Sequence, residues 1–141
     1  MATKADFSET EWQALHWAVM DTMAYLSMAD PGFMDMFKEA NAAAKYIAAA
    51  RVGSDSAVVR QLASEVKAKR DKSVSSNPAD IAGQVAERVR EAAGIVAGKA
   101  PEDLDEFKAF ILGVAKATAE AAKGVSTGEA KAIEKLEAAL G

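Results

Sequence analysis

Apolar residues recur along the chain at the three- and four-residue spacing of amphipathic helices, without the alternation that is typical of strands. The first apolar stripe consists of Trp12, Leu15, Val19, Met23 and Leu26. Just before it, Ser8 and Glu11 have the spacing of a capping box, in which the hydroxyl accepts a first-turn amide and the carboxylate reaches back. Phe7 can pack against Trp12 as a hydrophobic staple. These positions predict a helix that begins near Ser8.

The first predicted helix carries apolar side chains on more than one side. Trp17 and Tyr25 fall opposite the stripe, while His16 and Met20 lie on its flank. A helix that is apolar on two sides is either central in its bundle or makes a second contact. We therefore expect this helix to do more than cover one face of a core.

Prolines, glycines and capping residues mark the other helices. Helices are predicted after Asp30-Pro31-Gly32 to about Arg51, around Val59, Leu62 and Val66, from Pro78 to Gly98, from Pro101 to Lys123, and after a second capping box at residues 126–129. The Ser- and Asn-rich stretch at 73–78 is predicted to be a mobile loop. The pattern predicts one all-α domain over residues 1–141, in which about six helices form two helical hairpins around one core.

Composition narrows the possible functions. The 141 residues include 50% hydrophobic residues and no cysteine, which excludes disulfides, thiolate metal sites and cysteine nucleophiles. A formal charge of -4 and the lack of a phosphate-loop motif disfavour nucleic-acid and nucleotide partners. Charged residues interrupt every apolar run before it could span a bilayer, and the first residues lack the apolar segment of a signal peptide. We expect a cytoplasmic protein without an integral membrane segment.

Methionines are concentrated in the first predicted hairpin, where five of the six occur. Methionine is flexible and polarizable, so such a cluster can form an adaptable groove for a partner helix or a small apolar ligand. We predict a docking face for a protein partner or a second copy, formed by Trp17, Tyr25, Met20, Met28 and Met34. Core packing between the first two helices explains the same residues.

Three carboxylates surround the predicted corner between the first two helices. Asp30, Asp35 and Glu39 could together supply oxygen ligands to a divalent cation as a cofactor. In the alternative interpretation, Asp30 caps the helix and the other two are solvated. The spacing does not match the calcium loop of an EF-hand.

His16 is the only histidine, so schemes that need two histidines fail. With Met20 four residues later, it could ligate a haem or copper ion, border a site for an apolar ligand, or serve as the general base of a small enzyme. The alternative, which the general behaviour of such residues favours, is an imidazole at the edge of the core beside a packing thioether. Nothing selects a catalytic pair among the 21 acidic residues.

The two predicted corners, Ala29-Asp30-Pro31-Gly32 and Ala122-Lys123-Gly124-Val125-Ser126-Thr127-Gly128-Glu129, resemble those of the tellurite-resistance TerB-like family of small helical proteins. The resemblance implies an all-α bundle associated with stress responses, acidic corner residues that bind divalent cations, and protein partners at membranes. Only Asp30 and Glu129 carry over as ligands, because Lys123 stands where the family has an aspartate. The sequence as a whole predicts a non-enzymatic, stress-associated helical interaction module of TerB-like type.

Overall fold

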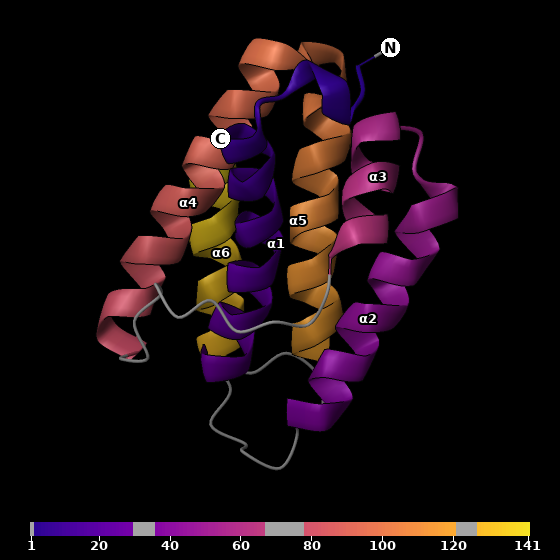
Figure 1. Cartoon of the computed structure of the whole chain (residues 1–141). Coiled ribbons are helices and arrows are strands. Elements are labelled where there is room, and N and C mark those ends of the chain that lie inside the picture. The colour runs from indigo at the N-terminus through magenta and orange to yellow at the C-terminus, as the bar shows by residue number, and fades with distance from the viewer. Residues whose placement is uncertain (1, 30–35, 67–77, 121–126) are drawn as a thin grey trace.

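The computed structural model describes residues 2–29, 36–66, 78–120 and 127–141, with the backbone alone at the helix ends 27–29, 36–40, 78–79 and 127–128. In these ranges the chain is helical and contains no strand, which confirms the all-α prediction and the six helices (Figure 1). The elements are η1 (Lys4–Asp6), α1 (Glu9–Ala29), α2 (Met36–Gly53), α3 (Ala57–Glu65), α4 (Pro78–Lys99), η3 (Pro101–Asp103), α5 (Leu104–Glu120) and α6 (Thr127–Leu140). The loop predicted at 73–78 lies outside the described residues except for Pro78, which begins α4.

Helix α1 is the centre of the bundle. It packs along α4 and α5 and also contacts α6 (Figure 1). Its residues Leu15, Val19 and Leu26 are completely buried. It makes few contacts with α2, which packs mainly against α3 and α5. Helices α1 and α2 therefore both pack against α5 and contact each other only slightly in the described residues. Within those residues they do not share a core of methionine side chains.

Local interactions fix the start of α1 as the sequence predicted. The backbone N–H of Ser8 donates to Glu11 Oε1 at 2.8 Å, and the N–H of Glu11 donates to Ser8 Oγ at 3.1 Å, so the capping box is confirmed. The bond from the Ser8 backbone lowers the pKa of Glu11, which keeps the cap ionised. The rings of Phe7 and Trp12 lie 5.6 Å apart, as the staple requires.

An ion pair joins α1 to α4 inside the bundle. Asp21 on α1 is only 1% exposed, and Arg88 Nη1 donates to its Oδ2 at 3.0 Å. The next residue, Thr22, is also buried and donates its hydroxyl to the carbonyl of Ala18 at 2.7 Å. Because buried polar groups need partners, the Asp21–Arg88 pair constrains how α1 is rotated against α4, whereas the Thr22 bond lies within α1 and satisfies its own hydroxyl.

No helix in the described part of the chain is both long enough and apolar enough to cross a membrane.

A close approach between α2 and α5 depends on a glycine. Tyr46 on α2 stacks on Phe110 of α5, with ring centroids 6.1 Å apart and an interplanar angle of 20°. A Cβ atom on Gly113 of α5 would overlap the hydroxyl and the ring of Tyr46. The missing side chain therefore allows the tyrosine to lie across α5.

We expect Gly113→Ala to destabilise the protein by about 1–2 kcal/mol, because the Tyr46 ring must leave its stacked position. Gly94→Ala on α4 is the matched control. A Cβ there meets nothing within 4 Å, so the higher helix propensity of alanine should stabilise the protein by about 1 kcal/mol. Urea unfolding of both variants measures the difference, and equal effects would contradict the packing described.

Candidate functional site

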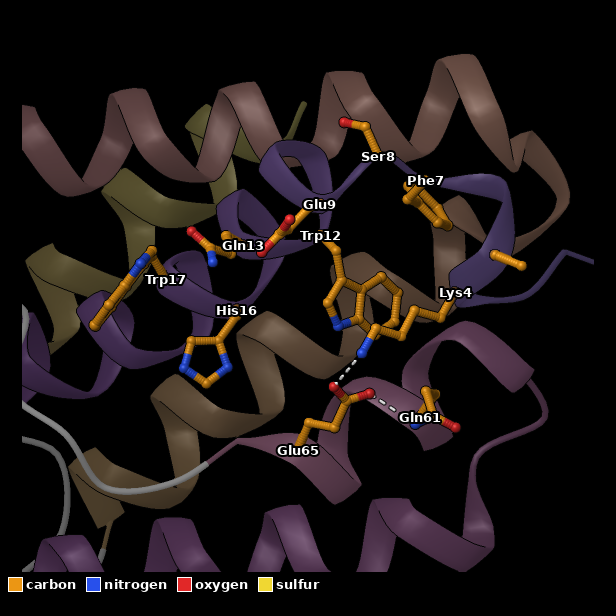
Figure 2. A pocket seen from close by; sticks show the side chains of 11 residues that line it. Lys4, Phe7, Ser8, Glu9, Trp12, Gln13, His16, Trp17, Gln61 and Glu65 are labelled. Atoms are coloured by element: carbon orange, nitrogen blue, oxygen red, sulfur yellow. Dashed lines mark hydrogen bonds and ion pairs between the residues drawn. The ribbon is translucent and has the colours of Figure 1, made fainter.

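An open cleft of about 920 Å³ lies between the N-terminal turn, α1 and α3. Figure 2 shows its side chains, which come from these three elements. The cleft exists because α3 packs mainly on α2 and makes few contacts with α1, so that one side of α1 stays uncovered there.

Aromatic residues form one wall of the cleft along α1. Trp12 is only 6% exposed and is held by Phe7, so the position of its ring is fixed. His16, one helical turn later, and Trp17 also line the cleft, and both are partly exposed. The rings of His16 and Trp17 meet edge to face, with centroids 5.3 Å apart and an interplanar angle of 81°. The capping box and the hydrophobic staple that fix the start of α1 therefore also fix the position of this aromatic wall.

A charged pair crosses the cleft beside Trp12. Lys4 Nζ of η1 donates to Glu65 Oε1 of α3 at 2.7 Å and lies 5.7 Å from the centroid of the Trp12 ring (Figure 2). Gln61 Nε2 donates to the other oxygen of Glu65 at 2.7 Å. An ammonium group is therefore held between an aromatic face and an oriented carboxylate, which is the arrangement of a cation site.

The surroundings keep Glu65 ionised. Partial burial, the largest single influence, raises the pKa of its carboxyl. Hydrogen bonds from Lys4 and Gln61, the charge of Lys4 and a hydrogen bond from the Trp12 indole together outweigh burial and lower the pKa below its usual value of 4.5. The carboxylate is thus negatively charged at neutral pH.

The structure separates the residues predicted to form a docking face. Trp17 lies in the wall of the cleft, but Met20 and Tyr25 are 6% and 8% exposed and belong to the core. The burial of Tyr25 also raises the pKa of its phenol. Met34 and the side chain of Met28 lie outside the described residues. The described methionine and tyrosine therefore offer no exposed apolar surface, because packing against neighbouring helices covers them.

The predicted cation site falls largely outside the described residues, which do not include Asp30, Asp35 or the side chain of Glu39. Glu129 is described and is 2% exposed on α6. Among the described side chains, no group of three or more His, Asp or Glu residues could hold a metal ion. A divalent-cation site at the first corner stays a prediction from the sequence.

The structure gives His16 and Met20 different surroundings. His16 lines the cleft, whereas Met20 is buried in the core. The imidazole therefore belongs to the aromatic wall of the cleft. The catalytic and ligand-binding roles weighed for His16 stay predictions.

Three important residues of the cleft were missed by sequence reasoning. Lys4, Gln61 and Glu65 carry ordinary surface side chains in ordinary helical positions, and Lys4 and Glu65 are 61 positions apart. Only the fold brings them together. The pair Trp12 and His16, spaced four residues apart on one helix face, was the available signal for the aromatic wall.

We expect Lys4→Gln to raise the pKa of Glu65 towards its usual value, because the substitution removes the charge that stabilises the carboxylate. NMR titration of the Glu65 carboxyl carbon across the acidic range measures the shift in both proteins. Since the pKa is lowered in the folded state, the contribution of the ion pair to stability is present above pH 4.5 and is lost as the pH falls through the lowered value. An identical pKa in both proteins would show that the contact is absent in solution.

Comparison of the chain with models of known protein families, with curated proteins and with solved structures finds no match in any of the three. The resemblance to TerB-like proteins therefore rests on the corner motifs and the order of the helices.

Proposed function

We propose that this protein is a non-enzymatic interaction module that docks a segment of a partner protein in the cleft between the N-terminal turn, α1 and α3. One observation carries the proposal. Phe7, Trp12, His16 and Trp17 line a single open cleft whose other side chains, apart from Ala5, are polar or charged. An apolar, aromatic centre with a polar rim is the usual anatomy of a protein-binding surface.

The aromatic wall suits an anchor residue of a partner. Tryptophan is enriched among the residues that contribute most to protein–protein binding, because it buries a large rigid surface with little loss of conformational entropy. Trp12 is fixed by the core, and Trp17 packs against the core while keeping part of its ring accessible. A docked side chain would therefore meet a rigid wall, which lowers the entropic cost of binding.

The proposed function, protein docking, is of the class predicted from the sequence, but the docking surface is a different one. The sequence predicted docking through Trp17 together with Tyr25 and the methionines of the first hairpin. We retain Trp17 and replace Met20 and Tyr25, which do not line the cleft, with the partly exposed His16 and with Trp12, which is as buried as Met20 but borders the cleft beneath Lys4. The corner residues that resemble the TerB-like family support a stress-associated role for the partner complex.

Selection of short peptides from a displayed random library tests the proposal. We expect the wild-type protein to enrich peptides that bind the cleft, and we expect Trp17→Ala to weaken them at least about 30-fold, as loss of a 2 kcal/mol hot spot would. Val52→Ala is the matched control, because Val52 is an exposed apolar side chain (85% exposed) that does not line the cleft. Peptide affinity measured by fluorescence polarization should be the same for this control and the wild type.

A second variant separates binding from folding, since Trp17 also packs against the core. Gln13 is exposed and lines the cleft, so Gln13→Arg should obstruct the site without removing core packing. We expect it to weaken the same peptides while thermal unfolding stays unchanged. The proposal is wrong if no peptide is enriched, or if the enriched peptides bind both cleft variants as tightly as the wild type.

A further inference from the structure

The geometry points to a partner segment that places a lysine or arginine side chain against both the face of the Trp12 ring and the Glu65 carboxylate, where it displaces Lys4. This inference rests on the proposed docking function and names the chemistry of the partner. In the structure, the Lys4 ammonium occupies the place of that cation, 2.7 Å from Glu65 Oε1 and 5.7 Å from the Trp12 ring centroid. Lys4 is in this sense a ligand supplied by the chain itself.

The two sides of the cation site are formed independently of Lys4. Gln61 donates to Glu65 Oε2 at 2.7 Å from the preceding turn of α3, which orients the carboxylate. Trp12 is buried and packs against Phe7, which fixes the plane of the indole. An aromatic face and a carboxylate held in place in this way attract an ammonium or guanidinium group without further rearrangement.

Lys4 itself is held weakly enough to be exchanged. Its side chain is 49% exposed and that of Glu65 is 31% exposed, and ion pairs in such surroundings contribute little to stability. The turn that carries Lys4 has other attachments. The backbone N–H of Thr3 donates to Asp6 Oδ2 at 2.8 Å, and Phe7 is buried. Departure of the lysine side chain therefore leaves the turn in place and opens the site.

The charges of the cleft favour a basic occupant. The charged side chains in its lining are Lys4, Glu9 and Glu65. When Lys4 leaves, two carboxylates beside an aromatic wall remain, and this combination attracts a cation and repels an acidic segment.

The probe for the test is the tightest peptide recovered from the displayed library, prepared as selected and with its basic residue replaced by norleucine. We expect selected peptides to share a lysine or arginine beside apolar residues. The norleucine form should bind about tenfold more weakly, since it keeps the aliphatic chain and loses the charge. Isothermal titration calorimetry with the full chain measures both affinities.

Three variants of the protein test whether the basic residue of the peptide binds beside Glu65. Lys4→Gln should bind the selected peptide about three- to fivefold more tightly, because the internal competitor is gone. Glu65→Gln should bind it about tenfold more weakly. Lys99→Gln is the matched control, since this lysine is also about half exposed (47%) and pairs with Glu11 outside the cleft; its affinity should change by less than about twofold.

The outcomes separate this inference from the proposed function. If no peptide is enriched, the docking function itself fails. If enriched peptides depend on Trp17 but lack a basic residue, or bind Lys4→Gln no more tightly than the wild type, docking stands and the basic partner is wrong. A dimer in sedimentation that Trp17→Ala dissociates would also overturn the inference, because a second copy would then fill the cleft.

Discussion

The burial of α1 between α4, α5 and α6 is the interaction on which the rest of the structure depends. Leu15, Val19 and Leu26 are completely buried, and each contributes about 2 kcal/mol of hydrophobic stabilisation. The ion pair between buried Asp21 and Arg88, whose side chain is 29% exposed, adds a directional contact between α1 and α4 that favours one rotation of the helix. Once this rotation is fixed, Trp12, on the same helix, faces the cleft.

The rotation of α1 also decides which surface is left for binding. Met20 and Tyr25 turn into the core, while His16 and Trp17 stay on the side that α3 leaves uncovered. A surface of this kind is stable because its aromatic side chains are half buried by their own bundle and still present a face to the outside. The charged pair formed by Lys4 and Glu65 covers the edge of that surface in the absence of a partner.

Local features of the fold could be predicted from the sequence, and tertiary features could not. The capping box of Ser8 and Glu11 and the staple of Phe7 and Trp12 depend on neighbours within five residues, and both are confirmed. The burial of Tyr25 and the pairing of Asp21 depend on where α4 and α5 lie, which helical periodicity does not specify. The cation site joins residues 4 and 65, so it has no signature in either segment. The two-sided apolar pattern of the first helix correctly indicated that α1 is central.

Chemical-shift mapping of the ¹⁵N-labelled protein with a peptide selected from the displayed library tests the central claim most directly. The account predicts that the largest changes occur at the indole N–H groups of Trp12 and Trp17 and at the side-chain amide of Gln61, all in the cleft. The amides of Gly94 and Gly98 on α4 should stay unchanged, since neither glycine lines the cleft. Changes that concentrate on α4 and α6 and spare the two indoles would contradict the account.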